Sequence, residues 1–129
     1  MSVAMTNDIR LTVLFLLLIQ HFLFDWILQP RWVAINKSKN LVAIIIHTVI
    51  VTIGFSIPSF CVFTPRQAIL VSCAYGLLHG AQDRIVWSTF RPKTDIPYGE
   101  KQFWNRIAID QFIHLAVGIV LLKGIIPSI

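Results

Sequence analysis

The sequence predicts an all-α membrane protein, a four-transmembrane-helix antiparallel bundle. Three observations lead to this fold class. The chain of 129 residues is 56% hydrophobic and has a mean hydropathy of +0.73, which is more apolar than a soluble domain of this length can bury. It contains four apolar runs, each long enough to cross about 30 Å of hydrocarbon as a helix. Prolines and short polar stretches separate the runs, so we expect a single transmembrane domain over residues 1–129.

The first helix is expected over about residues 9–29. The run Leu11–Leu28 contains only two ionisable residues, His21 and Asp25. No small-x-small cleavage site follows it, so we expect it to remain in the mature protein rather than to be removed as a signal peptide. Pro30 is expected to end this helix because proline cannot continue a helical hydrogen-bond ladder.

The remaining helices are expected over about residues 40–58, 66–89 and 103–124. The second lies in a stretch without any charged residue, and Pro58 is expected to end it. Pro65 stands where the third helix can begin, and Pro92 is expected to end that helix. Short connections between consecutive helices then require antiparallel neighbours.

Basic residues are distributed unequally between the two ends of the expected bundle. Eight of the eleven fall on the side of the 30–39 and 90–102 loops, and three fall on the side of the termini and the 59–65 turn. By the positive-inside rule the first side is cytoplasmic, which predicts a multi-pass protein of the bacterial inner membrane with both termini outside the cytoplasm. This topology and anionic lipid headgroups account for the net charge of +5, and no nucleic-acid footprint is evident. The basic residues of the first side are Arg31, Lys37, Lys39, Arg84, Arg91, Lys93, Lys101 and Arg106, and the tryptophans Trp26, Trp32, Trp87 and Trp104 lie at the same end.

Two further features concern packing rather than chemistry. Cys61 and Cys73 stand in apolar surroundings, which predicts buried, inert thiols and no disulfide or zinc-thiolate site. Gly76 and Gly80 are four residues apart on the third helix, which favours close approach of a neighbouring helix.

Histidine and aspartate recur at a fixed spacing within the apolar runs. All four histidines lie in expected helices, and three stand four residues from an aspartate in the stretches HFLFD, HGAQD and DQFIH. Residues at this spacing share one helical face, about 6 Å apart along the axis. The order is reversed on the fourth helix, which runs opposite to the first and third, so each carboxylate is expected nearer the cytoplasmic side and each histidine one turn deeper. The residues of this layer are His21, Asp25, His47, His79, Asp83, Asp110 and His114.

Such a layer is typical of a metal site. A charged group at membrane depth costs a few kcal/mol unless it is paired. Imidazole and carboxylate donors suit Zn, Mn or Fe, and seven donors exceed the four that one tetrahedral ion needs. We therefore expect one or two divalent metal ions bound by these residues, with one of the catalytic candidates Asp25, Asp83 and Asp110 acting as a base.

Less specific explanations exist for each part of the layer. A single histidine near a membrane helix end is more often a satisfied polar contact than a ligand, and a single His–Asp pair can be a hydrogen bond between helices. A proton or ion relay would use the same residue types. Bis-histidine haem ligation is a further option, yet haem has no need of an aspartate one turn from three histidines. Three pairs aligned in depth favour the metal site over these alternatives.

Polar residues beside the layer suggest supporting roles. Arg84 and Arg106 can hold the phosphate or carboxylate of a substrate, or can extend to the headgroups without any such role. Three glutamines can hydrogen-bond the ligands, although glutamine is also tolerated near membrane interfaces. These are Gln29, Gln82 and Gln111.

The stretches HFLFDWILQPRWVAINKSKN, HGAQD and DQFIH, with His47 on the helix between the first two, resemble the DUF3307 family of small membrane proteins of bacteria and their phages. The resemblance covers most of the chain, and its specific parts are HxxxDxxxQ followed by a basic loop and the closing DQxxH. It implies the architecture and the site but no reaction. A looser similarity to inner-membrane metal-dependent hydrolases related to DUF457 implies hydrolysis by analogy. HGAQD is more polar and glycine-rich than the family pattern leads us to expect at that position.

Together these observations predict a metal-dependent integral membrane enzyme. The expected reaction is hydrolysis of an ester or phosphoester of a lipid-embedded substrate near the cytoplasmic face, with Arg84 or Arg106 holding the anionic group. An ion, proton or metal transporter is the alternative, although few polar residues continue towards the opposite side. A third hypothesis is a non-enzymatic phage or plasmid effector that binds a host membrane protein. Membrane lipids are the expected partners, and homo-oligomers are expected under the effector hypothesis.

Overall fold

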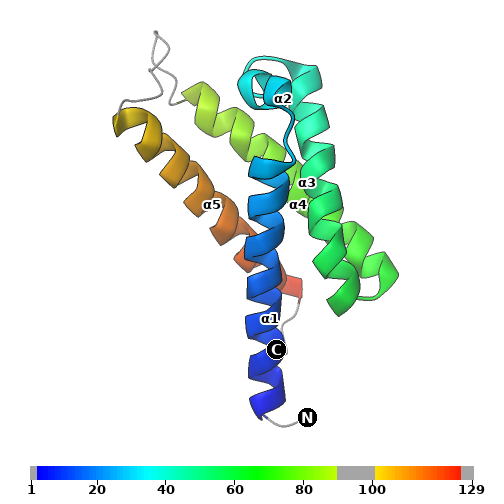
Figure 1. Cartoon of the computed structure of the whole chain (residues 1–129). Helices are drawn as coiled ribbons and strands as arrows, with labels where there is room; N and C mark the ends of the chain where they lie inside the picture. The colour runs from blue at the N-terminus through cyan, green and yellow to red at the C-terminus, as the bar shows by residue number, and fades with distance from the viewer. Residues whose placement is uncertain (1–2, 90–100, 126–129) are drawn as a thin grey trace.

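The computed structural model describes residues 3–89 and 101–125, and within these ranges the chain is helical with no strand (Figure 1). The predicted all-α class is confirmed. The expected stop at Pro92 and the basic residues Arg91 and Lys93 lie outside the described residues. In chain order the elements are α1 (Val3–Phe22), the π-helical segment η1 (Leu23–Ile27), α2 (Arg31–Asn36), α3 (Leu41–Val62), α4 (Pro65–Thr89) and α5 (Lys101–Ile125).

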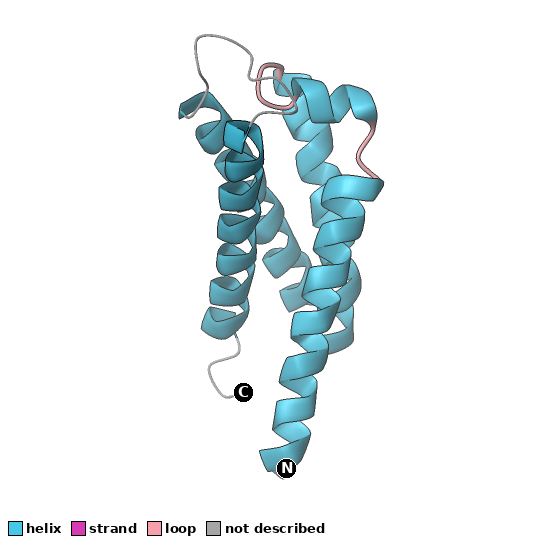
Figure 2. Ribbon diagram, turned by 60° about the vertical axis from the view of Figure 1, so that its left-hand side comes forward, coloured by secondary structure: helices cyan, strands magenta, loops and turns pink. Residues whose placement is uncertain are grey.

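The four long helices alternate in direction along the chain (Figures 1 and 2). The short helix α2 lies at one end of the bundle, and the turn between α3 and α4 lies at the other. The most extensive helix–helix contact joins α3 and α4, while α1 contacts α3 and α5, and α5 also contacts α4. The arrangement brings the middle of all four long helices together around one interior.

Side chains at the turns explain where α3 and α4 begin. Asn40 precedes α3, and its Oδ1 accepts hydrogen bonds from the backbone N–H groups of Val42 and Ala43 at 2.8 and 3.3 Å. Thr64 is the residue just before α4, and its N–H and hydroxyl donate to Gln67 Oε1 at 3.2 and 2.8 Å. These contacts satisfy donors that lack a partner at the start of a helix. Pro65 is the first residue of α4, as predicted, because its missing N–H costs nothing there.

The prediction that Pro58 ends the second helix is wrong. Helix α3 continues to Val62 and contains Pro58 in its interior. Pro58 and the following Ser59 are buried, and the Ser59 carbonyl accepts from Phe63 N–H at 2.9 Å to close the last turn. Proline removes one hydrogen bond from a helix, and packing on both sides of it supplies enough stabilisation to carry the helix past that point.

The segment between the first two long helices also differs from the expected 30–39 loop. It contains helix α2, for which Pro30 forms the N-cap, and the buried Val33 fixes α2 against the bundle. Before it, the first helix ends in the π-helical turn η1, marked by a hydrogen bond from Leu28 N–H to the Leu23 carbonyl at 2.7 Å. Single π turns are rare and often occur at functional sites.

The close contact expected at the two glycines of α4 is present. A methyl group added at Gly76 would meet the Thr52 side chain, and one added at Gly80 would meet the Thr48 side chain. Because glycine has no Cβ, α3 and α4 approach closely along this line. This contact places the middle of α3 directly against the middle of α4.

The distribution of polar and apolar side chains is inverted relative to a soluble bundle. Large apolar side chains on three different helices face outward, with Phe15 61%, Ile53 54% and Phe112 73% exposed. Cys61 and Cys73 are also exposed, so the prediction of buried thiols is wrong. The interior contains histidine, aspartate, glutamine and serine side chains beside an apolar cluster that includes Phe55 and Tyr75.

Among the described residues, α3 is the one helix that is long and apolar enough to cross a membrane by length and composition, and Leu14–Ile27 is a shorter apolar helical stretch. The ionisable side chains of the interior reduce the apolar character of α4 and α5. The structure therefore supports one candidate span, and the other three spans stay predictions.

Candidate metal centre

All seven residues of the predicted layer are buried in one region of the bundle. Asp83 and His47 are 0% exposed, and His21, the most accessible of the seven, is 7% exposed. Each long helix contributes: His21 and Asp25 come from the first helix and its π turn, and His47 comes from α3. Helix α4 supplies His79 and Asp83, and α5 supplies Asp110 and His114.

The contacts between helices are shorter than those within them. Along single helices, His21 Nε2 lies 3.7 Å from Asp25 Oδ2 and His79 Nε2 lies 4.0 Å from Asp83 Oδ2. Across helices, His47 Nε2 lies 2.9 Å from Asp83 Oδ2 and 3.1 Å from Asp25 Oδ1. The π turn η1 contains Asp25 and lets this carboxylate project towards α3. The fixed sequence spacing therefore places the residues at one level, and helix packing selects their partners.

The first group of donors consists of Asp25, His47, His79 and Asp83, whose ligand atoms lie within 4.8 Å of one another. His47 Nε2 and His79 Nε2 are 3.0 Å apart, and His79 Nε2 is 3.5 Å from Asp25 Oδ1. Donors bound to one tetrahedral ion at the usual bond lengths stand about 3.4 Å apart. Two imidazoles and two carboxylates at these distances form a complete donor set for one divalent ion.

Two further groups surround His114, and each shares a carboxylate with the first group. Asp83, Asp110 and His114 form one of them, and His21, Asp25 and His114 form the other. His114 Nε2 lies 3.2 Å from Asp83 Oδ1 and 3.9 Å from Asp110 Oδ1. The His114 ring stacks on the His79 ring, with centroids 3.7 Å apart. Asp83 thus faces His47 with one oxygen and His114 with the other.

Several donor atoms of the histidines have no hydrogen-bond partner in the described part of the chain. These include Nδ1 of His79 and Nδ1 of His114, although His79 and His114 are each 1% exposed. A buried polar atom without a partner costs on the order of 1–3 kcal/mol. Borderline N and O donors without partners are the type that Zn, Mn or Fe binds, so the residues present fit a metal ion.

Glutamines orient two of the histidines. Gln29 Nε2 donates to His47 Nδ1 at 2.6 Å, so a neutral His47 carries its proton on Nε2, towards the carboxylates. Rotation of the amide would let its oxygen accept from Nδ1–H and would free the Nε2 lone pair for an ion. Gln111 Oε1 accepts from His21 Nε2 at 2.6 Å, and Gln111 Nε2 donates to Asp25 Oδ2 at 3.1 Å. Because His21 Nε2 is used in this way, His21 can bind an ion only if Gln111 releases it.

Lys37 belongs to the site, and sequence reasoning assigned it only to the basic loop. It follows α2 directly, and its Nζ lies 2.8 Å from Asp83 Oδ2 and 3.5 Å from Asp25 Oδ1. Burial lowers the pKa of Lys37, but the neighbouring carboxylates of Asp83 and Asp25 outweigh burial, so the net effect raises the pKa above its ordinary value. Lys37 is therefore a cation at neutral pH. The sequence feature that could have located Lys37 is Pro30. A proline can stand at the start of a helix, and the helix that begins here returns the basic stretch to the bundle.

A known protein family matches most of this chain. A family model described as "Protein of unknown function (DUF3307)" matches residues 13–128. The chain belongs to the DUF3307 family. No curated protein and no solved structure matches it. The DUF3307 match includes every residue of the cluster, from His21 to His114, and it assigns no reaction to them.

In this DUF3307 chain the remaining candidate residues lie at the edge of the cluster. Arg84 is exposed, and its Nη1 donates to the Ser38 carbonyl at 3.0 Å, which anchors the turn that follows Lys37. Arg106 is half-buried on α5, one turn before Asp110. Gln82 Nε2 donates to the Asp110 carbonyl at 3.2 Å. The substrate-binding roles of Arg84 and Arg106 stay predictions.

Proposed function

We propose that this protein is a multi-pass membrane enzyme that binds two divalent metal ions within its helical bundle. In this proposal it hydrolyses an ester or phosphoester of a lipid-embedded substrate. The observation that carries the proposal is the position of Asp83, whose Oδ2 lies 2.9 Å from His47 Nε2 and whose Oδ1 lies 3.2 Å from His114 Nε2. A carboxylate that presents its two oxygens to two donor groups is suited to bridge two ions, as in two-metal hydrolytic sites.

The charge of the cluster supports bound cations. Asp25, Asp83 and Asp110 are buried together, and the Lys37 ammonium contacts the carboxylates of Asp25 and Asp83. Uncompensated buried carboxylates are costly, and binding a metal is one of the ways in which proteins remove that cost. Divalent ions at the two donor groups would neutralise the excess negative charge.

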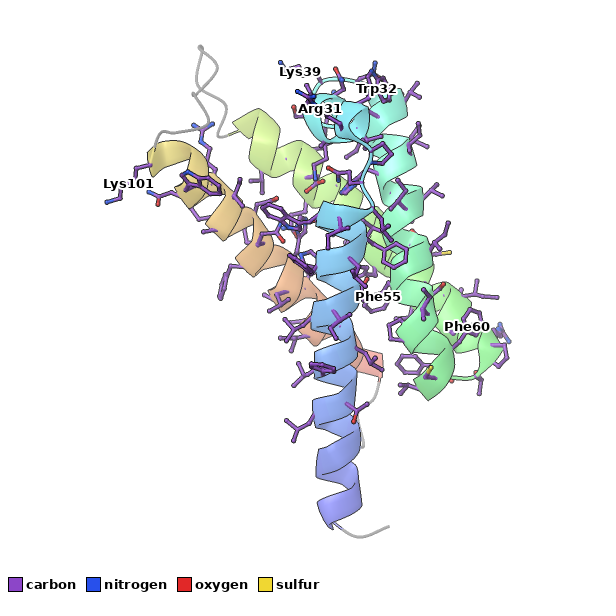
Figure 3. All side chains as sticks on the ribbon, in the orientation of Figure 1. Arg31, Trp32, Lys39, Phe55, Phe60 and Lys101 are labelled. Atoms are coloured by element: carbon purple, nitrogen blue, oxygen red, sulfur yellow. The ribbon has the colours of Figure 1, made fainter. Side chains whose placement is uncertain are left out.

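The inverted polarity of the bundle supports a membrane location. Large apolar side chains are exposed on the outside of the long helices, while a cluster of ionisable groups is buried inside, as expected where lipid rather than water surrounds a protein. Figure 3 places Arg31, Lys39 and Lys101 at the end of the bundle that contains α2 and Trp32. Trp26, Trp32 and Trp104 are 42%, 49% and 44% exposed. Basic and tryptophan residues at one end favour a cytoplasmic orientation of that end in a bacterial inner membrane, with both termini outside.

The chemistry follows from the donor types. Divalent ions lower the pKa of bound water and make it a nucleophile at neutral pH. Asp25 and Asp83 each belong to two donor groups, whereas Asp110 belongs to one. We therefore assign Asp110 as the carboxylate that takes the proton from the attacking water. Arg106 is placed one turn from Asp110, where its guanidinium can hold an anionic substrate group.

The test is metal content followed by activity. Detergent-purified protein is analysed for Zn, Mn and Fe, and wild type is compared with His47→Ala and with Ser56→Ala, a control whose hydroxyl bonds the Ile53 carbonyl of its own helix. Wild type and the control should hold metal, and the His47 variant should lose it. Metal-loaded protein is then screened against lipid esters and phosphoesters. Wild-type protein without metal after reconstitution would contradict the proposal.

A transporter is the second candidate, and one observation favours it. Ser72 is two turns from His79 towards the opposite end of α4, is 1% exposed, and has an Oγ without a hydrogen-bond partner within the described ranges. Polar groups of this kind can continue a path beyond the cluster. Metal uptake into proteoliposomes without hydrolysis of any lipid would favour transport over catalysis. An effector that only binds a host protein would show neither metal binding nor hydrolysis.

A further inference from the structure

Lys37 contacts the same atoms that form the first donor group. Its Nζ lies 2.8 Å from Asp83 Oδ2, 3.5 Å from Asp25 Oδ1 and 3.3 Å from His47 Nε2. Three of the four residues of that group therefore present their ligand atoms to the ammonium.

The contacts with the two carboxylates identify the role of the ammonium. Lysine has only donors, so Lys37 Nζ faces lone pairs of Asp83 Oδ2 and Asp25 Oδ1, at 2.8 and 3.5 Å. These carboxylate lone pairs are among the electron pairs that a metal ion would use. The Lys37 ammonium thus stands in the place of a cation bound by this group.

An ammonium and a divalent ion cannot share these atoms. A bound ion would lie about 2.0–2.2 Å from the same nitrogen and oxygens. With Nζ at its observed distances, two positive charges would then stand a few ångströms apart in a buried site, where their repulsion is poorly screened. Occupation by one cation therefore excludes the other.

We propose that Lys37 is the resident cation of the first donor group in the metal-free protein, and that a divalent ion binds there only by displacing it. This inference rests on the proposed metal site and adds a regulation to it. The Lys37 side chain is 13% exposed, so its ammonium has a route to water. The buried Val33 and the Arg84 bond to the Ser38 carbonyl hold the backbone on either side of Lys37, so the exchange requires movement of the side chain alone.

The exchange has two consequences for the protein. Without metal, Lys37 keeps two buried carboxylates paired, and the bundle does not depend on metal to fold. With metal, the free energy of binding is reduced by the cost of removing Lys37. Coupling between groups within a protein typically changes the affinity for a ligand by about 5- to 150-fold.

The first experiment measures metal affinity in Lys37→Met, which keeps the length of the side chain and removes its charge. Lys39→Met is the matched control, because Lys39 lies two residues further in the same turn and is exposed. Chelator-stripped protein in detergent is titrated with Zn²⁺ against a chromophoric competitor. One equivalent should bind about tenfold or more tightly in Lys37→Met, and Lys39→Met should match wild type. Equal or weaker binding by Lys37→Met, with wild type binding normally, would overturn the inference and leave the metal site in place. Absence of binding in wild type would overturn both.

The second experiment uses wild-type protein, so its result does not depend on how a variant folds. Lysines are labelled with a water-soluble amine reagent with and without Zn²⁺, and the modification of Lys37 is quantified by mass spectrometry relative to Lys39. Displacement should raise the labelling of Lys37 several-fold when Zn²⁺ is added, while Lys39 stays constant. Unchanged labelling of Lys37 in protein that demonstrably holds Zn²⁺ would contradict displacement.

Discussion

Asp83 on α4 lies closer to His47 on α3, at 2.9 Å, than to the histidine one turn before it on its own helix, at 4.0 Å. The same carboxylate oxygen also lies 2.8 Å from Lys37 Nζ, which stands beside His47. Asp83 therefore joins residues of different helices. Its neutralisation is expected to affect the site more than neutralisation of Asp110, which belongs to a single donor group.

Asp83→Asn is expected to remove both bound ions, whereas Asp110→Asn is expected to retain them and to lose activity. The reason is that Asp83 belongs to two donor groups, while Asp110 belongs to one and is the proposed base. Asparagine keeps the shape and removes the charge, so a loss of metal reports on ligation. Equilibrium dialysis with elemental analysis measures the stoichiometry. Equal losses in the two variants would argue against a bridging carboxylate.

Gln29→Leu is expected to weaken metal binding by about 10- to 100-fold without changing the fold. Gln29 Nε2 lies 2.6 Å from His47 Nδ1, and rotation of this amide on metal binding would let its oxygen accept from Nδ1–H and leave the Nε2 lone pair for the ion. The measurement is Zn²⁺ affinity by competition, with helical content checked by circular dichroism. Wild-type affinity in this variant would show that Gln29 does not orient the ligand.

Gly80→Ala is expected to destabilise the bundle by about 1–3 kcal/mol, because the added methyl group meets the Thr48 side chain on α3. Thr48 follows His47, so metal affinity should fall as well. Thr48→Ala in the same chain should recover part of the loss, as a double-mutant cycle would detect. Unfolding in detergent measures the effect, and Ala81→Leu at the neighbouring exposed position is the control. If Gly80→Ala and Ala81→Leu have the same stability, the close contact at Gly80 does not determine the stability of the bundle.

Chelation of metal is expected to lower the midpoint of thermal unfolding. A ligand that binds only the folded state at a free concentration one hundred times its Kd contributes about 2.7 kcal/mol. The loss should be reversible, since Lys37 keeps Asp25 and Asp83 paired in the metal-free protein. Differential scanning fluorimetry with EDTA, followed by addition of Zn²⁺, tests this. Irreversible unfolding on chelation would contradict the role given to Lys37.

The proposed topology predicts how the two exposed cysteines react. Cys61, near the end of α3 beside the turn to α4, should react with a membrane-impermeant maleimide added from outside the inner membrane. Cys73 lies within the length of α4 on its exposed side, and lipid should protect it from the reagent. Lys39→Cys in a Cys61→Ser background should react only after the membrane is opened. Labelling of Lys39→Cys in intact spheroplasts would reverse the orientation.

Hydrophobic runs predicted the long helices well, since each run is set by local composition. The boundaries failed where tertiary contacts compete with local signals. Pro58 is a helix stop by local chemistry, yet buried packing continues α3 past it to Val62. The π turn at Leu23–Ile27 and the short helix α2 have no periodic pattern long enough to read in the sequence. The exposed cysteines were misjudged because apolar neighbours in sequence do not reveal which side of a helix faces outward.

The sequence by itself determined which residues occupy the interior layer. Spacing along a helix fixes depth and face, and reversal of the order on α5 keeps Asp110 and His114 in line with the other pairs. The tertiary structure alone decided which residues are in contact: His47 with Asp83, Gln111 with Asp25, and Lys37 with both carboxylates. The physical reason is the distance along the chain over which each effect acts. Helical periodicity acts over a few residues, whereas these partners are brought together by the packing of helices and by a turn whose path the local sequence does not specify.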